Sequence, residues 1–304
     1  MPQDVPPDVP PDAWDAAQYE RFQTQRQQPF FDLLALVRGR PGMRVVDLGC
    51  GTGTLTRELH LALAARETVG IDSSPAMLAR AAPLAVAGLR FEPGDIAEFA
   101  AAGAYDLVFS NAALHWVPDQ ATLLRRLSEA LTPGGQLAVQ VPASHDDAAH
   151  RVAAELAAEP PFQETLAGSA PALATVLTPR EYALLLDRLG YREQHVRLQV
   201  YAHRLASRDE VVEWAQGTLL TTYRRRLGPE LYPQFLQAYR DRLLPRLDDR
   251  RPYLFPFQRI LFCSSGPVGR PARHPLAPAT HAWIDRSIIR MVIRKNRIRS
   301  RVEE

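Results

Sequence analysis

The sequence predicts an α/β fold built on a parallel sheet, because a strand, a glycine turn and a helix follow one another in its first third. Residues 44–47 form a short run with strand character, and the turn Leu48-Gly49-Cys50-Gly51-Thr52-Gly53 follows at once. From Thr54 the apolar period becomes helical, with Leu55, Leu59 and Leu63 four apart. Glycines let a ligand approach the backbone and the first helical amides offer donors, so this segment predicts a site for the polar part of a nucleotide-like ligand.

A second apolar run, residues 68–72, ends in an acid. Asp72 lies 19 residues beyond Gly53, close to the spacing at which a carboxylate at the end of the second strand reaches ribose hydroxyls. The glycine spacing is G-x-G-x-G, which differs from the G-x-G-x-x-G of nicotinamide and flavin folds.

The remaining elements follow from the same kind of pattern. Further strands are predicted at residues 89–92, 105–109, 136–141, 195–201 and 257–263. Helices are predicted at residues 30–37, 54–65 and 123–131, the last ending in the turn 132–135. Ser73 or Ser74 is expected to cap a further helix that has Pro75 in its first turn.

Residues 47–53, 70–77 and 106–111 resemble the successive motifs of class I S-adenosylmethionine-dependent methyltransferases, and the likeness is closest to the trans-aconitate 2-methyltransferase family. The resemblance implies a Rossmann-like seven-stranded sheet that is mostly parallel, with an antiparallel last strand. It also implies S-adenosyl-L-methionine as the cofactor. The cofactor-binding residues expected along these motifs are Asp47, Gly49, Gly51, Asp72, Ser73, Met77, Asp95, Ile96 and Asn111.

Two of these residues have roles that rest on the resemblance alone. In the family a residue at the position of Met77 lies beside the adenine, and one at the position of Asp95 reaches the adenine amino group. The alternatives are a core methionine and a simple turn carboxylate.

Residues 14–26 resemble the family's N-terminal W-x-x-x-x-Y-x-x-F-x-x-x-R pattern, which implies an arm over the cofactor. Tyr19, Phe22 and Arg26 share one helical face, and the resemblance implies that Tyr19 and Arg26 bind the cofactor. Arg26 is expected to hold the cofactor carboxylate through two hydrogen bonds. The alternative is that this stripe packs the first helix onto the sheet.

The domain organisation is predicted from the insertions. Residues 1–13 are expected to be a disordered leader, because prolines oppose both helix and central strand, and residues 14–265 to form the methyltransferase domain. A helical cap over the substrate pocket is expected at about 145–180, after the fifth strand, and at about 207–250, between the sixth and seventh strands. Residues 266–304 are expected to be a basic, disordered tail, with a membrane-surface or RNA-binding helix as the alternative.

The candidate catalytic residues come from two places. His115 and Trp116 follow the carboxyl end of the fourth strand, where open α/β sheets bind ligands, although plain packing would also explain them. In the cap, Tyr223, Arg224 and Arg225 belong to an arginine-rich run that is either an anion site or a solvated helix face.

Composition and motifs limit the kinds of molecule with which the protein is expected to interact. A net charge of +2 over 304 residues gives no indication of a specific nucleic-acid partner. The run Ser110-Asn111-Ala112-Ala113 also lacks the N-P-P-Y-like pattern of enzymes that methylate DNA bases. We expect no signal peptide, because the first residues are acidic and rich in proline, and no membrane span, because no apolar run is long enough to cross a bilayer. Two distant cysteines without metal-ligand spacing fit a cytoplasmic protein with no metal site, and the oligomeric state stays open.

The expected reaction is methyl transfer to a carboxylate of a small polycarboxylic acid, with trans-aconitate as the substrate that the resemblance implies. A carboxylate is already a nucleophile at neutral pH, so positioning and desolvation can drive the reaction without a general base. One alternative is a methyltransferase of another acid, such as malonyl-acyl carrier protein, or of another small molecule. A second is a non-catalytic protein that binds S-adenosylmethionine.

Overall fold

The computed structural model describes residues 23–143, 147–167 and 176–265. The predicted leader, Tyr19 and the predicted tail lie outside the described residues. Arg26 falls within the first described helix, but its side chain lies outside the described part.

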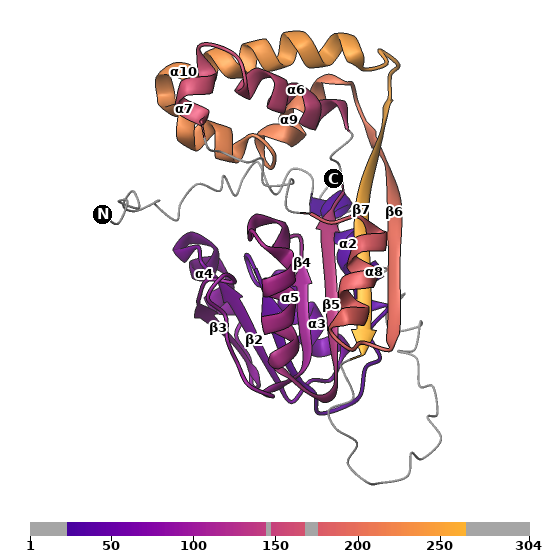
Figure 1. Ribbon diagram of the computed structural model, residues 1–304. Coiled ribbons are helices and arrows are strands. Elements are labelled where there is room, and N and C mark those ends of the chain that lie inside the picture. The colour runs from indigo at the N-terminus through magenta and orange to yellow at the C-terminus, as the bar shows by residue number, and fades with distance from the viewer. Residues whose placement is uncertain (1–22, 144–146, 168–175, 266–304) are drawn as a thin grey trace, which may run out of the picture.

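Seven strands form one sheet in the described part of the chain: β1 (Arg44–Leu48), β2 (Glu67–Asp72), β3 (Leu89–Pro93), β4 (Tyr105–Asn111), β5 (Leu131–Pro142), β6 (Glu193–Leu205) and β7 (Tyr253–Ser265). Their order is β3-β2-β1-β4-β5-β7-β6 (Figure 1). The first five strands pair in parallel, whereas β7 runs antiparallel to both β5 and β6. The predicted fold class is confirmed, including the antiparallel last strand.

Helices cover both faces of this sheet. On one face α2 (Gln23–Leu34) and α3 (Thr54–Ala62) pack through apolar side chains such as Phe30 and Leu59. On the other face α5 (Gln120–Glu129) and α8 (Pro179–Arg188) bury Leu124 and Tyr182. Alternation along the buried strands supplies both cores, since Val45 faces one cluster and Val46 the other.

Several element boundaries differ from the predicted ones. The first described helix begins before Phe30 and ends at Leu34, with hydrogen-bonded turns continuing to Val37. The predicted turn at 132–135 is counted within β5, because the pairing with β4 jumps from Tyr105–Leu131 to Leu107–Gln136 and leaves four residues as an irregular excursion. Three shorter helices also lie beside the sheet: α4 (Pro75–Ala81), η1 (Ala82–Leu84) directly after it, and η2 (Leu114–Trp116) after β4.

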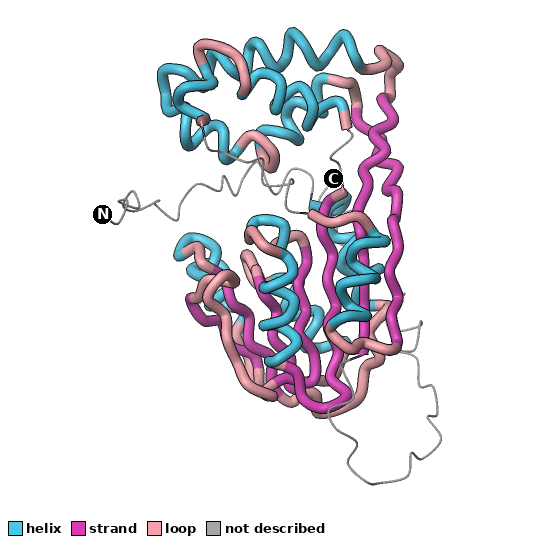
Figure 2. The backbone as a smooth tube through the Cα atoms, viewed as in Figure 1, coloured by secondary structure: helices cyan, strands magenta, loops and turns pink. Residues whose placement is uncertain are grey.

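β6 and β7 form a two-stranded ribbon that continues beyond the rest of the sheet. The two strands pair along all 13 residues of each, from Glu193–Ser265 to Leu205–Tyr253. β5 pairs with β7 only as far as Arg259. The remaining part of the ribbon therefore leaves the sheet and runs up to a group of helices, as Figure 2 shows.

These helices, called the cap below, are α6 (Ala148–Ala157), α7 (Phe162–Leu166), α9 (Asp209–Gln216), α10 (Thr221–Leu243) and η4 (Leu244–Arg246). The cap has a hydrophobic core of its own, which includes Trp214, Tyr223 and Phe235 and the ribbon side chains Phe255 and Phe257. The rings of Tyr223 and Phe235 stack with centroids 5.0 Å apart. The apolar faces of the cap helices are thus buried against one another and against the ribbon.

Two arginine–glutamate pairs join the cap helices at the surface. Arg242 donates to both carboxylate oxygens of Glu159, at 2.7 and 2.6 Å, and Arg246 donates likewise to Glu155 at 3.0 and 2.8 Å. Exposed pairs of this kind add little stability individually. Their two-pronged geometry ties the end of α10 to the segment after α6, and η4 to α6 itself.

α10 bends where glycine and proline meet. Gly228 has φ +66° and ψ −173°, a conformation that only glycine adopts readily, and Pro229 follows it. Across the described ranges, no helix has the length and apolar character needed to cross a membrane.

We predict that Phe235→Ala lowers the free energy of unfolding by about 3 to 5 kcal/mol, because a fully buried ring at the centre of the cap leaves a cavity. Leu254→Ala is the matched control, since Leu254 lies on the ribbon but is 48% exposed. Urea denaturation measures both variants. A small and equal effect in the two would contradict a packed cap core.

Candidate active site

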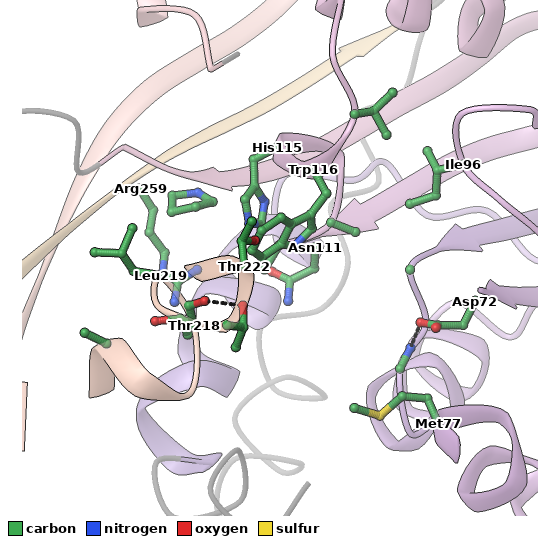
Figure 3. A pocket seen from close by; sticks show the side chains of 18 of the residues that line it. Asp72, Met77, Ile96, Asn111, His115, Trp116, Thr218, Leu219, Thr222 and Arg259 are labelled. Carbon is green, nitrogen blue, oxygen red and sulfur yellow. Dashed lines mark hydrogen bonds between the residues drawn. The ribbon is translucent and has the colours of Figure 1, made fainter. Parts of the chain in front are cut away.

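A cavity of about 660 Å³ lies between the carboxyl ends of the central strands and the cap. Figure 3 shows Asp72 and Met77 on one side, Arg259 and Leu219 on the other, and Asn111, His115 and Trp116 between them. Parallel strands end at this edge of the sheet, which is where open α/β sheets hold their ligands.

The glycine turn after β1 brings the backbone to the cavity wall. Gly49 has φ +77°, and a Cβ there would lie 2.2 Å from the Cβ of Ala113, so only glycine fits against the segment after β4. Gly51 has φ +55° and open space beside its Cα. Its N–H donates to Asp72 Oδ2 at 2.8 Å, which ties the turn to the end of β2.

Asp72 is held by the backbone on both oxygens. Besides the Gly51 contact, its Oδ1 accepts a hydrogen bond from Ser74 N at 2.9 Å. Of the two serines expected as candidates, Ser74 is the N-cap of α4 and accepts from Met77 N at 3.3 Å. Ser73 is exposed and lines the cavity, as does Met77 from α4.

Asp47 is a buried carboxylate at the bottom of the same wall. Thr56 Oγ1 donates to its Oδ2 at 2.6 Å. Burial raises the pKa of Asp47 to about 7, although the Thr56 hydrogen bond opposes the rise, and the charge of Asp72 adds to it. The carboxyl group is therefore poised between its neutral and charged forms at physiological pH.

The segment after β4 supplies an amide and two aromatic rings. Asn111 ends β4, and its Oδ1 is buried without a hydrogen-bond donor among the described residues. Ala112 follows with φ +58°, a strained conformation for a residue with a side chain, and turns the chain into η2. The rings of His115 and Trp116 lie with centroids 4.7 Å apart.

His115 is buried and uncharged. Burial, followed by the positive charges of Arg259 and His150, lowers the pKa of His115 to about 3. The imidazole can exchange hydrogen bonds with a ligand but adds no positive charge to the cavity.

Asp95 and Ile96 follow β3 and also line the cavity. Asp95 is exposed, and its Oδ1 accepts from Ala97 N at 2.7 Å. All nine expected cofactor-binding residues from Asp47 to Asn111 thus line one cavity, while Tyr19 and the side chain of Arg26 lie outside the described residues.

The cap forms one wall of the cavity, and only part of its arginine-rich run lines that wall. Tyr223 is buried and lines the cavity, and burial raises the pKa of Tyr223 to about 12. Arg225 and Arg226 also line the cavity, whereas Arg224 is exposed and contributes nothing to the lining. Consecutive residues point about 100° apart around a helix, so the run cannot face one direction.

Sequence analysis missed Arg259, which lies in β7 at the point where the ribbon leaves the sheet. Arg259 is 6% exposed and lines the cavity. Its Nη1 donates to Gln140 Oε1 at 3.2 Å, and its guanidinium carbon lies 4.8 Å from the ring centroid of Phe257. The signal available in the sequence was an arginine inside a predicted apolar strand.

A family model and several curated proteins match this chain in sequence. Residues 40–189 match the family model described as a methyltransferase domain. The chain is 43% identical to the trans-aconitate 2-methyltransferase of Deinococcus radiodurans over 84% of this chain and 98% of that protein. It is 39% identical to the enzyme of the same name from Methylobacterium nodulans, over 81% of this chain and 96% of that protein.

Solved structures show the same fold at low sequence identity. The YcgJ protein of Bacillus subtilis superposes with a TM-score of 0.56 at 16% identity, covering 80% of this chain and all of that chain. A putative methyltransferase from Bacillus halodurans gives 0.51 at 15% identity, over 78% and 98% of the two chains. These two likenesses concern the fold, while the sequence identities above identify the relatives. The chain belongs to the trans-aconitate 2-methyltransferase family.

Proposed function

We propose that the protein uses S-adenosylmethionine to esterify a carboxylate of trans-aconitate. The observation that carries this proposal is one cavity with two unlike walls. At the strand ends the wall presents the acids Asp47 and Asp72 and the amide of Asn111. The cap and β7 present arginines, among them Arg225 and Arg259. The first wall suits a ligand with hydroxyl and cationic groups, and the second suits an anion.

The residues of the first wall fit S-adenosylmethionine in their chemistry. Asp72 has each oxygen held by one backbone amide, and each keeps a lone pair for a ribose hydroxyl. Gly51 leaves open space for close approach to the backbone. The buried Oδ1 of Asn111 and the carboxyl of Asp47 suit a positively charged donor group. The cofactor supplies a methyl group bound to a positively charged sulfur.

The second wall supports binding of the acceptor in a largely dry site. The aromatic side chains of Trp214, Tyr223 and Phe257 limit the access of water, which strengthens the attraction between an acid and the arginines. The acceptor carboxylate needs no deprotonation, so the residues of the cavity serve to align and desolvate it. A neutral His115 is consistent with this division, because no proton has to be removed.

The direct test is transfer of labelled methyl from S-adenosylmethionine to trans-aconitate, cis-aconitate, citrate, isocitrate and malonyl-acyl carrier protein. We expect base-labile label on trans-aconitate well above the other acceptors, because esters hydrolyse in base. Tight binding of the cofactor without label on any acid would reject the proposed acceptor and favour a protein that only binds the cofactor.

We expect Asp72→Ala to weaken binding of S-adenosylmethionine by more than about 1 kcal/mol, since a charge-assisted hydrogen bond is lost. Calorimetric titration without an acceptor measures this effect, and thermal unfolding reports separately on the lost contacts to Gly51 and Ser74. Glu92→Ala removes an acid from β3 outside the cavity lining and should leave affinity unchanged. Equal affinity in the wild type and Asp72→Ala would remove Asp72 from the cofactor site.

Asp47 should make stability depend on pH. Its folded pKa of about 7 lies above the usual value of a free aspartate, about 3.9, so the folded state keeps a proton that the unfolded chain releases. The free energy of unfolding should fall as pH rises from about 4 to 7, by at most roughly 4 kcal/mol, and then level off. Asp47→Asn should lack this fall, and urea denaturation at pH 4.5 and 7.5 compares the two. Parallel pH dependence in both proteins would contradict the prediction.

Arg225 and Arg224 offer a matched pair of variants. We expect Arg225→Ala to raise the KM for trans-aconitate about tenfold, since loss of one charged contact amounts to about 1.5 kcal/mol. Arg224→Ala removes the same charge one residue earlier, outside the cavity, and should change KM less than twofold. Initial-rate kinetics with saturating cofactor measure the KM of both variants. Identical KM values would show that Arg225 does not contact the acceptor.

A further inference from the structure

We propose that Arg259 holds an acceptor carboxylate that does not receive the methyl group, and that this contact makes the enzyme specific for polycarboxylic acids. The inference rests on the proposed function, because it concerns how the same cavity selects its acceptor. It assigns a role to a residue that no sequence motif singled out.

The position of Arg259 places a positive charge on the interior wall of the cavity. Arg259 pairs with Pro142 of β5 and Gln199 of β6, at the last point where β7 is joined to the sheet on both sides. Alternation along β7 puts its side chain on the same face as Leu261 and Cys263. Arg259 is 6% exposed, in contrast to the exposed Arg225 and Arg226 at the cap.

Two neighbours help to hold the guanidinium in place. Gln140 is fully buried on β5, and its Oε1 accepts from Arg259 Nη1 at 3.2 Å. The guanidinium also lies over the ring of Phe257, at 4.8 Å from carbon to centroid. An amide and a ring orient the group, and neither of them carries a negative charge.

The charge of Arg259 acts on both halves of the cavity. It is the largest cause after burial of the lowered pKa of His115, about 3, and of His203, about 4. His115 follows β4, and His203 lies on the ribbon stacked against Trp214. Both imidazoles are therefore neutral at physiological pH, whereas the guanidinium of Arg259 keeps its positive charge.

The chemistry of the transfer indicates which carboxylate Arg259 holds. A carboxylate oxygen that forms a bond to the methyl carbon loses its negative charge as the carbon–sulfur bond breaks and the electron pair returns to sulfur. A guanidinium bound to that carboxylate would stabilise the reactant more than the transition state and slow the reaction. A carboxylate that stays charged throughout carries no such penalty. Arg259 also lies across the cavity from Asp72, the residue proposed to hold the cofactor ribose (Figure 3).

The test compares trans-aconitate with three diacids that each lack a different one of its carboxylates: glutaconate, mesaconate and itaconate. The variants are Arg259→Gln, which removes the charge, and Arg259→Lys, which keeps it but loses the planar fork. Gln140→Glu keeps the arginine but places a carboxylate beside its guanidinium. Arg204→Gln is the control, because Arg204 is an exposed arginine on the same ribbon outside the cavity lining.

We expect Arg259→Gln to raise the KM for trans-aconitate about 100-fold. One of the three diacids lacks the carboxylate that Arg259 holds, and the KM for this diacid should change less than threefold. Gln140→Glu should show the same selectivity, Arg259→Lys an intermediate rise of about tenfold, and Arg204→Gln no change. Affinity for S-adenosylmethionine, measured without acceptor, should be unaltered in every variant, which also reports that the proteins are folded.

An equal loss for trans-aconitate and every reactive diacid would overturn the proposal, as would an effect confined to kcat. If the wild type transfers no methyl to trans-aconitate, the proposed function fails, and calorimetric binding of trans-aconitate to the complex with S-adenosylhomocysteine then decides the role of Arg259. If the wild type binds trans-aconitate and Arg259→Gln weakens this binding, the proposed role of Arg259 is supported. Equal binding in the two proteins, or none in the wild type, would reject it.

Discussion

The continuous pairing of β6 with β7 is the constraint on which the rest of the structure depends. The lower part of β7 completes the sheet beside β5, and the upper part of the same strand enters the core of the cap. Backbone hydrogen bonds run along the whole ribbon, so the ribbon ties the cap to the sheet. Arg259 lies at the junction, where the position of one strand relative to β5 sets the guanidinium against Gln140. The two walls of the cavity are thus positioned by one element.

Burial controls the charges inside the cavity more than the number of ionisable groups does. The pKa of Asp47 is raised because burial disfavours its charged form. Burial also lowers the pKa values of His115 and His203, as does the charge of Arg259, so both stay neutral. A guanidinium does not lose its proton near neutral pH, so an arginine keeps its positive charge even when it is buried. The interior consequently offers a fixed cation beside hydrogen-bonding groups whose protonation depends on what surrounds them.

The fold, and the gathering of the expected cofactor-binding residues on one wall of the cavity, could be predicted because their signals are local in sequence. A glycine turn and an acid at the end of the next strand identify the edge where Gly51 meets Asp72, and parallel strands bring successive ends together. The acceptor half could not be predicted in the same way. Which of Arg224 and Arg225 faces the cavity depends on the rotation of α10, and the importance of Arg259 depends on where the ribbon leaves the sheet. Tertiary packing decides both, and a single sequence does not display it.

The separation of the two hydrophobic cores has a consequence for how such enzymes diversify. The cap side chains pack among themselves and on the upper ribbon, while the sheet has its own clusters on its two faces. In the proposed division of the cavity, changes in α9 or α10 would therefore remodel acceptor recognition while the glycine turn and its carboxylate keep their geometry. We expect the cap to be exchangeable, so that grafting another cap at the ribbon would give new acceptors with the same donor.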